Sequence, residues 1–334
     1  MRILTINSGS SSIKFAVYGM PGEERELTGT LASIGEAAQR LGSANQPDVI
    51  GHRLVHGGPN HSAPQLVTPE LLANLRKLIP LAPNHLPRQI DAMEQMAKLY
   101  PAARQVACFD TAFHRHMPAL AQLYALPEAL RRDGLLRRYG FHGLSYEYIC
   151  GELAKRNQLG GRVVICHLGN GASMAAVRDG QSIETTMGLT PTGGLVMATR
   201  CGDIDPQVVL FLMEEKGLSA AQARAAITEQ AGMLGISGFS GDMRELQASG
   251  EASAKLAIDA FCYSACKMIG ALAAALGGLD RIVFTGGIGE NDGMVRRRIC
   301  EGIRFLGTVQ VDVIPTNEEL MIARHAAAAA ATQA

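Results

Sequence analysis

The order of apolar and polar positions divides the chain into short strand-like runs and longer helix-like stretches that alternate throughout. Runs such as ILTIN and RIVFT are short and largely apolar, which is typical of buried strands. The Ala-rich segment from Ala252 to about Leu276 instead repeats its apolar positions with a helical period and predicts one long helix. Strands that alternate with helices favour an α/β fold with mixed sheets.

Two segments about half a chain apart share one plan. The first, near Asn7, reads ILTIN, SGSSS and IKFAVYG, and the second, near Asn170, reads VVICHLGNGAS and MAAVRDG. Each is an apolar strand, a tight turn rich in glycine and small hydroxyl residues, and a second strand that ends at glycine. A third unit, RIVFTGGIGEN, breaks on glycines after a strand and leads into a helix from Asp292. A duplicated two-domain fold would repeat its units in this way.

Several helix starts are marked by capping residues. Thr68 and Asp205 each precede a proline, which predicts an N-cap followed by proline in the first helical turn. Thr316 and Glu319 have the spacing of a capping box, with Glu319 as the reciprocal partner. The alanine run at 326–331 is expected to extend or fray the helix that follows.

Composition narrows the class of protein. The 334 residues are 47% hydrophobic and 19% charged, enough for two domains with sizeable cores. Lys+Arg and Asp+Glu number 31 each, which argues against a nucleic-acid partner. No apolar run approaches the about 18 residues of a membrane span, and the N-terminus has too short an apolar run for a signal peptide. Seven cysteines without a CxxC pair predict reduced thiols rather than disulfides or zinc. We therefore expect a cytoplasmic protein without membrane partners.

The glycine-rich turns are either ordinary hairpins or phosphate-binding loops. Small residues let backbone N–H groups approach an anion closely, and two such turns at matched positions favour phosphate binding. The sequence contains no GxxxxGK[ST] loop. It also departs from the GxGxxG pattern after the strand RIVFT, because Asp292 occupies the place of the third glycine. A nucleotide fold of another kind is indicated.

Eight sequence blocks, taken together, resemble the acetate kinase family. They occur in the family's order and span the chain: NSGSSSIKF from Asn7, GHRLVHGG from Gly51, FDTAFH from Phe109, YGFHG from Tyr139, HLGNGAS from His167, MGLTP…ATRCGDIDP from Met187, FTGGIGEN from Phe284 and VIPTNEE from Val313. The resemblance implies the sugar kinase–Hsp70–actin superfold, a duplicated actin-like (ribonuclease H-like) α/β fold with a cleft between two domains. We expect an N-terminal domain at 1–148, rejoined by a C-terminal helix at 317–330, and a C-terminal domain at 149–316.

The implied activity is direct, reversible transfer of a phosphoryl group from ATP, with Mg²⁺ or Mn²⁺, to acetate, by a homodimer. Two unit charges about 4 Å apart repel by about 4 kcal/mol at an effective dielectric constant near 20, so fixed cations are needed at the transfer point. The resemblance implies that Arg53 binds the substrate carboxylate and that Arg200 binds the phosphoryl group during transfer. It implies His142 as a hydrogen-bond partner of that group. A carboxylate substrate is already ionised near pH 7 and needs no base, so we expect Asp110 to orient the metal through water.

The resemblance also assigns further residues to three groups. The walls of the acyl pocket are Val55, Asn84, Phe141 and Pro191. The metal site contains Asn7 and Glu318. The ATP site contains Lys14, His167, Leu168, Gly169, Asn170, Gly171, Asp242, Met243, Arg244, Gly287, Ile288, Gly289, Glu290 and Asn291.

Four positions depart from the family pattern. Leu144 and Tyr146 replace a Thr and a His, Gly193 stands where a Glu is usual, and Asn84 replaces an apolar wall residue. These changes leave open a propionate or other short-chain carboxylate kinase. A second alternative is an ATP-driven conformational protein of the same superfold. The chain has no spare domain for a polypeptide client, and formation of acetyl phosphate would separate the two classes.

Overall fold

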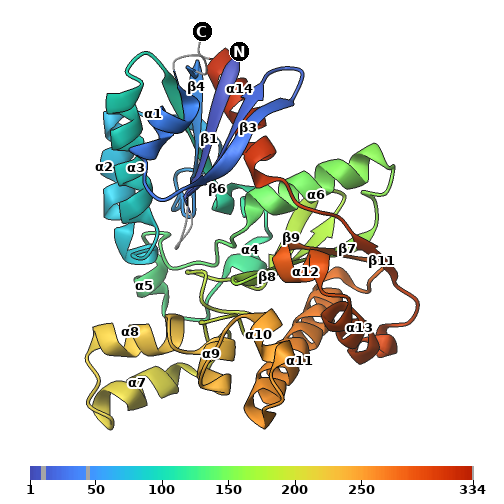
Figure 1. Cartoon of the computed structure of the whole chain (residues 1–334). Helices are drawn as coiled ribbons and strands as arrows, with labels where there is room; N and C mark the ends of the chain where they lie inside the picture. Colours follow the sequence, from blue (N-terminus) through green and yellow to red (C-terminus); the bar gives the residue numbers. More distant parts are fainter. Residues whose placement is uncertain (9–12, 43–45, 333–334) are drawn as a thin grey trace.

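Two mixed β-sheets, each flanked by helices, make up the computed structural model, which describes residues 1–8, 13–42 and 46–332 (Figure 1). The first sheet has the order β3-β2-β1-β4-β6-β5, with strands β1 (Arg2–Ser8), β2 (Ile13–Gly19), β3 (Glu24–Leu31), β4 (Val49–Leu54), β5 (Gln65–Leu66) and β6 (Arg104–Phe109). The second has the order β11-β10-β7-β8-β9, with strands β7 (Arg162–Leu168), β8 (Ala172–Arg178), β9 (Gln181–Thr185), β10 (Arg281–Thr285) and β11 (Gln310–Val313).

The two sheets repeat one topology. In the first, β1, β2 and β3 form an antiparallel meander, while β4 and β6 follow in parallel on the other side of β1. In the second, β7, β8 and β9 form the same meander, and β10 and β11 follow in parallel beside β7. This shared order of five strands confirms the predicted duplicated α/β fold.

Helices cover both sheets. Those before β7 are α1 (Glu36–Leu41), α2 (Pro69–Lys77), α3 (Leu86–Leu99), α4 (Ala119–Gln122), α5 (Glu128–Arg131) and α6 (Gly143–Lys155), with 3₁₀ turns η2 (Ile79–Leu81) and η3 (Asp110–His114). Those after β9 are α7 (Pro206–Glu214), α8 (Ala220–Thr228), α9 (Gly232–Ser237), α10 (Met243–Ala248), α11 (Ala252–Leu276), α12 (Gly286–Asn291), α13 (Gly293–Gly302), η4 (Arg304–Leu306) and α14 (Glu318–Thr332).

Alternate residues of β1 face two different cores. Leu4 and Ile6 pack with α1 and α3, while Ile3 packs with α14 and the start of α6. The helix α14 returns to the first sheet so closely that a Cβ placed on Gly51 would lie 2.6 Å from Ile322 Cγ2. The glycine in β4 therefore permits this packing.

The helix α6 lies between the two sheets. Leu144, in its first turn, belongs to the core beneath the first sheet, whereas Ile149 and Leu153 pack against β7 and β8. The expected boundary between residues 148 and 149 falls within this continuous helix. The division into domains at that point stays a prediction.

The predicted helix starts at Thr68 and Asp205 are confirmed, since each side chain accepts a hydrogen bond from a backbone N–H of the first turn. The predicted capping box at Thr316 is wrong. Asn317 caps α14 instead, because its Oδ1 accepts the Leu320 N–H at 3.0 Å. The Thr316 hydroxyl is buried and has no hydrogen-bond partner among the described residues. Glu319 accepts a hydrogen bond from the Asn7 side chain rather than closing a capping box.

The predicted long helix matches α11, and the alanine run continues α14 as far as Thr332. By length and composition α11 could cross a membrane. Its buried residues, including Ala254, Phe261 and Leu272, pack in the core of the second sheet, as those of a core helix do. The segment GGIGEN forms the short helix α12 rather than a loop, and Asp292 caps the helix that follows.

Candidate active site

A central cavity of about 440 Å³ opens where the two sheets face each other. The end of β1, the end of β4 and the start of α14 supply one side, and the turn after β7 and the start of α12 supply the other. It is lined by Asn7, Lys14, Arg53, His142, His167, Gly169, Asn170, Gly171, Gly286, Gly287, Glu290, Thr316, Glu318 and Glu319. Residues from most of the matched sequence blocks therefore meet at one place.

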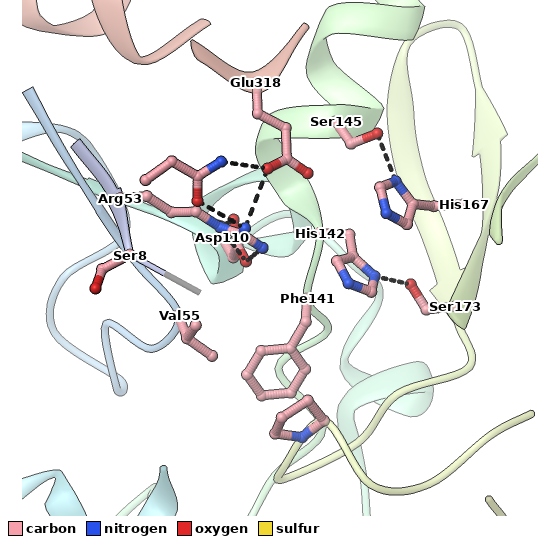
Figure 2. Close-up of polar contacts among 12 residues, drawn as sticks. Ser8, Arg53, Val55, Asp110, Phe141, His142, Ser145, His167, Ser173 and Glu318 are labelled. Carbon is pink, nitrogen blue, oxygen red and sulfur yellow. Dashed lines mark hydrogen bonds and ion pairs between the residues drawn. The ribbon is translucent and has the colours of Figure 1, made fainter. Parts of the chain in front are cut away.

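Arg53 is the centre of a buried ionic group in this cavity (Figure 2). Its Nη2 lies 2.7 Å from Asp110 Oδ2, and its Nη1 lies 3.1 Å from Glu318 Oε2. Asn7 contacts both Arg53 and Glu318, because its Oδ1 accepts from Arg53 Nη1 at 3.0 Å and its Nδ2 donates to Glu318 at 2.9 Å. Adjacent parallel strands end at the same edge of a sheet, so β4 and β6 bring Arg53 and Asp110 together.

The three ionised groups shift one another's proton affinities. Burial disfavours the Arg53 cation, but the nearby carboxylates of Asp110 and Glu318 outweigh burial and raise the pKa of Arg53. Burial also raises the pKa of Asp110, although Arg53 pulls it down. For Glu318 the cations prevail over burial, so its pKa is lowered, chiefly by Arg53. Glu318 is therefore a carboxylate at neutral pH, and it faces the cavity.

Arg200 is a half-buried cation with few protein partners. Its Nη1 donates to the Pro191 carbonyl at 3.0 Å, and no carboxylate within the described residues lies at ion-pair distance. Burial, and then repulsion by Arg53, lower the pKa of Arg200. Gly232, with φ of 63°, lets the neighbouring backbone approach, since a Cβ there would lie 2.8 Å from the Arg200 carbonyl. The fold thus holds a positive charge that is available to an anion.

His142 occupies a tight turn at the start of α6. Its φ is 55°, in the left-handed region that side chains rarely adopt. The next residue has to be glycine, because a Cβ on Gly143 would lie 1.9 Å from the Asp110 carbonyl oxygen. This close approach explains the sequence YGFHG and fixes the imidazole beside the ionic group.

The turn 169–171 and the start of α12 form the glycine-lined wall of the central cavity. Gly286 has φ of 78°, and a Cβ there would lie 2.8 Å from the Leu168 carbonyl oxygen. Glu290 ties this wall together, since its Oε1 accepts the Gly286 N–H at 2.8 Å and the Thr316 N–H at 3.0 Å. The first hydroxyl-rich turn, at residues 9–12, lies outside the described residues, but Lys14 after it lines the cavity.

Two neighbouring cavities extend the site. An outer cavity of about 640 Å³ shares part of the glycine wall and is lined by Gly169, Asn170, Asp242, Met243, Arg244, Gln247, Gly287, Ile288, Asn291 and Asp292. A side cavity of about 330 Å³ is lined by residues 80–85, 190–192, 199, 200, 224 and 227–229. Pro191, Asn84 and Arg200 all line the side cavity.

The structure gathers most of the expected site residues in these three cavities. Leu168 and Gly289 line none of them, because both are buried, and a Cβ placed on Gly289 would lie 3.6 Å from Leu168 Cβ. Val55 and Phe141 are also buried, in the same core cluster as Leu168. In Figure 2 they lie below Arg53 and His142. Asp110 has 2% of its side chain exposed and contacts Arg53 rather than the cavity. Its expected role toward a metal stays a prediction.

Asn84 differs from the expected apolar wall in having a polar partner of its own. Its Nδ2 donates to Glu229 Oε1 at 3.1 Å across the mouth of the side cavity. Beside it, His85 lies close to both arginines, and burial followed by their repulsion lowers the pKa of His85 to about 4. The wall of this cavity is therefore polar at Asn84 and uncharged at His85.

Sequence reasoning missed the hydroxyl groups that hold the two histidines. Ser173 on β8 contacts His142 Nδ1 at 2.7 Å, and Ser145 on α6 contacts His167 Nδ1 at 2.8 Å. Both serines lie inside or next to blocks that the sequence marked, in HLGNGAS and after YGFHG. Their contacts join residues far apart in the chain, so spacing alone carried no signal for them.

The comparisons with known proteins agree with this geometry. The sequence model of the acetokinase family matches residues 36–313. An acetate kinase of Rhodopseudomonas palustris (strain TIE-1) is 42% identical over 97% of this chain and 97% of the relative. An acetate kinase of Carboxydothermus hydrogenoformans is 39% identical over 97% of this chain and 98% of the relative. The first alignment runs over 386 positions although the chain has 334 residues, so the relative carries internal segments that this chain lacks.

Solved structures show the same fold across both sheets. An acetate kinase from Porphyromonas gingivalis superposes with a TM-score of 0.88 at 34% identity, over 98% of this chain and 99% of the other. A propionate kinase from Francisella tularensis superposes with a TM-score of 0.91 at 34% identity and the same coverage. The match of family model, curated relatives and structures covers both halves of the central cavity. The chain belongs to the acetokinase family.

Proposed function

We propose that this chain phosphorylates acetate reversibly with ATP, giving acetyl phosphate and ADP. One observation carries the proposal. A Cβ placed on Gly171 would lie 3.3 Å from Arg200 Nη1 and 3.6 Å from His142 Nε2, so a guanidinium, an imidazole and a glycine turn converge on one point. Convergent fixed donors of this kind stabilise the charge of a phosphoryl group during transfer.

The chemistry needs no protein nucleophile. A carboxylate oxygen of acetate attacks the γ-phosphorus of ATP in line, a new O–P bond forms, and the bond to the β–γ bridging oxygen breaks to release ADP. Arg200 and His142 donate to oxygens of the transferring group, and Arg53 lies where it can attract the carboxylate. We place the phosphates in the central cavity, the adenosine in the outer cavity and the acyl group toward the side cavity.

A magnesium ion fits the donors of the central cavity. Asn7 and Glu318 offer an amide and a carboxylate oxygen, which are the hard ligands that Mg²⁺ prefers. The described residues contain no group of three His, Cys, Asp or Glu that could hold a metal by themselves. Mg²⁺ normally takes only one or two carboxylates and keeps waters and phosphate oxygens. When bound, it would neutralise charge on the phosphates.

The test is formation of acetyl phosphate, trapped with hydroxylamine, from acetate, ATP and Mg²⁺. We expect hydroxamate that depends on acetate, on ATP and on the divalent ion, and none in excess chelator. ATP hydrolysis that ignores acetate and yields no hydroxamate would contradict the proposal and favour an ATP-driven conformational protein. Full turnover in chelator would contradict the metal site alone.

A propionate or other short-chain carboxylate kinase is the second candidate, and the side cavity favours it. Its volume of about 330 Å³ leaves room beyond a methyl group, and its wall carries the Asn84–Glu229 hydrogen bond. One methylene in an apolar pocket changes selectivity by only about 1–3 kcal/mol, so the two substrates are never far apart. We propose comparing kcat/KM for acetate, propionate, butyrate and glycolate in the unsubstituted chain and in Asn84→Leu. If the substitution leaves their ranking unchanged, Asn84 does not touch the acyl group.

We further propose a cytoplasmic homodimer. All seven cysteines are unpaired, which suits a reducing compartment. The helix α7 has no buried residue and exposes Val208, Leu210 and Phe211, so it offers an apolar surface to a second copy. Light scattering coupled to gel filtration tests the assembly, and a monomer at micromolar concentration would contradict it.

A further inference from the structure

Two imidazole rings lie face to face on the wall of the central cavity, and each is held at Nδ1 by a serine hydroxyl. The rings of His142 and His167 stack with their centroids 4.2 Å apart and an angle of 18° between their planes. Figure 2 shows His142 bound to Ser173 and His167 bound to Ser145. Within the part of the chain that the structure describes, neither Nε2 atom has a hydrogen-bond partner, so both remain available to the cavity.

The contact at His142 continues into a second hydroxyl. Ser173 Oγ on β8 is also hydrogen-bonded to the hydroxyl of Tyr146, which follows His142 by one turn on α6. Both side chains are fully buried, with 0% exposure. The pKa of Tyr146 is raised well above its usual value, chiefly by burial, so its hydroxyl keeps its hydrogen. The three groups therefore form a hydrogen-bonded row that begins at the buried Tyr146 and Ser173 and ends at His142 on the cavity wall.

The number of hydrogens decides the direction of this row. Tyr146 and Ser173 own one hydroxyl hydrogen each, and among the described residues neither has an acceptor outside the row. Both hydrogens are used only if Tyr146 donates to Ser173 and Ser173 donates to Nδ1 of His142. If His142 carried a proton on Nδ1, at least one buried hydroxyl hydrogen would lack an acceptor, which is unfavourable.

We propose that Tyr146 and Ser173 are positioning residues that hold His142 in the tautomer with its hydrogen on Nε2. That nitrogen faces Gly171 and lies near Arg200, at the point where donors converge. This inference rests on the function proposed above, in which the Nε2–H donates to an oxygen of the transferring phosphoryl group. A proton on Nδ1 would leave Nε2 as an acceptor, which would repel that oxygen.

The surroundings also keep this imidazole neutral. Burial, and then the neighbouring His167, Arg53 and Arg200, lower the pKa of His142 well below its usual value. His114 lies behind the same turn, where its Nε2 contacts the Phe141 carbonyl oxygen at 3.0 Å, and it adds to the lowering. A neutral ring has only one N–H, so the choice of tautomer decides whether the cavity receives a donor.

The first test observes the tautomer directly. Long-range ¹H–¹⁵N spectra of the full chain with ¹⁵N-labelled histidine distinguish protonated from unprotonated ring nitrogens, and His142→Gln identifies the signal to be assigned. We expect Nε2 of His142 to carry the hydrogen and Nδ1 to be bare near pH 7. A hydrogen on Nδ1 in the unsubstituted chain overturns the proposal. This measurement needs no activity, so it stands even if no acetyl phosphate is formed and the proposed function fails.

The second test removes one hydroxyl. Tyr146→Phe keeps the ring and deletes the outer donor, while Tyr148→Phe makes the same change on the same helix at a half-buried residue away from the cavity. We expect Tyr146→Phe to lower kcat about tenfold, the effect of one buried hydrogen bond, with KM for ATP little changed. Its spectrum should still show the hydrogen on Nε2, because Ser173 then donates to Nδ1 alone, whereas Ser173→Ala removes the donor to Nδ1 and should give a mixture of His142 tautomers. If Ser173→Ala keeps the hydrogen on Nε2 alone, or if Tyr146→Phe and Tyr148→Phe have the same kcat, the hydroxyl row does not position His142.

Discussion

Arg53 and Arg200 differ in how far protein carboxylates compensate their positive charges. Arg53 is paired with Asp110 and Glu318, whereas Arg200 contacts a carbonyl and no carboxylate among the described residues. A half-buried charge without a counter-ion is less well solvated than in water, and a bound anion offsets this cost. Arg200 is therefore suited to a group that arrives with the substrate, and Arg53 to one that is also structural.

Arg200→Ala tests the first half of this contrast. We expect kcat to fall at least about 10²-fold, because a fixed donor to the transition state is typically worth about 2.7–4 kcal/mol. We expect the thermal midpoint of the ligand-free chain to hold or rise, since a half-buried cation without a counter-ion is removed. The control is Arg297→Ala, which removes an exposed arginine of α13. Near-normal kinetics, or a large loss of stability, would refute the assigned role.

Arg53→Ala tests the second half. Removing this cation leaves two buried carboxylates without compensation, so we expect the free energy of unfolding to drop by about 3–5 kcal/mol. The double substitution Arg53→Ala with Asp110→Ala should lose less than the sum of the two single changes, because it also removes one stranded charge. Urea unfolding of the four proteins measures this coupling. Strict additivity would show that the pair does not stabilise the fold.

Three buried histidines outside the cavities predict acid sensitivity. Burial is the main cause that lowers the pKa of His52, His56 and His114 to about 4, against a usual value near 6.5 in the unfolded chain. The unfolded state therefore binds protons first, and stability is full above about pH 6.5 and is lost as pH falls toward 4. Each group contributes a slope of at most about 1.4 kcal/mol per pH unit in this window.

Urea unfolding at pH 8, 7, 6 and 5 measures this slope, and His114→Gln should reduce it by the contribution of one histidine. The lowered pKa of Glu318 acts at lower pH, below its usual value of 4.5, and does not mask the effect. A free energy of unfolding that is constant between pH 7 and pH 5 would contradict the prediction.

At the scale of elements, the start of α14 shows where sequence pattern failed. Thr316 and Asn317 can both cap a helix, and the box spacing favoured Thr316. In the structure the Thr316 N–H is already taken by Glu290 on another helix, and Tyr18 donates to Asn317 Oδ1 from β2 at 3.2 Å. Tertiary contacts from two distant elements thus moved the cap by one residue.

Two substitutions distinguish Asn317 from Thr316 as the N-cap of α14. Asn317→Ala should lower the free energy of unfolding by about 0.5–2 kcal/mol, because the Leu320 N–H loses its partner. Thr316→Val should be neutral or stabilising, since it replaces a buried hydroxyl that has no partner among the described residues. Urea unfolding of both variants tests the assignment. The reverse order of effects would restore Thr316 as the cap.

The same contrast separates what sequence could predict from what it could not. Strand pairs joined by glycine and hydroxyl turns near Asn7 and Asn170 were readable because apolar runs and turn residues are local signals. Arg53, His142 and Arg200 were found through family resemblance and met at one site. The hydroxyl row behind His142 was not predictable, because Ser173 lies on another element and its contact depends on how α6 packs against β8.

At the scale of the whole molecule, the two halves, each made of one sheet with its flanking helices, meet around the site. Arg53 and Lys14 come from the first sheet, and His167 and the glycine turn come from the second, with α6 and α14 between them (Figure 1). Asn84 and Glu229 join the halves directly, although they lie 145 residues apart in the chain. A relative motion of the halves would therefore change the central and side cavities together.

We expect the two halves to close over ATP and the carboxylate. The central cavity is open to solvent, and water is a competing acceptor for the phosphoryl group, so transfer to acetate requires that water be excluded. The physical cause is the uncompensated charge on one side of the site: Arg200 belongs to the second half, and an anion bound there also attracts Arg53 and Lys14 on the first.

Small-angle scattering with a non-hydrolysable ATP analogue, Mg²⁺ and acetate should show a smaller radius of gyration than the free chain. Arg200→Ala should show a weaker change, because it lacks the cation that the ligand must share with the other half. Identical profiles with and without ligands would mean that the halves are fixed and that water is excluded by loop or side-chain movements alone.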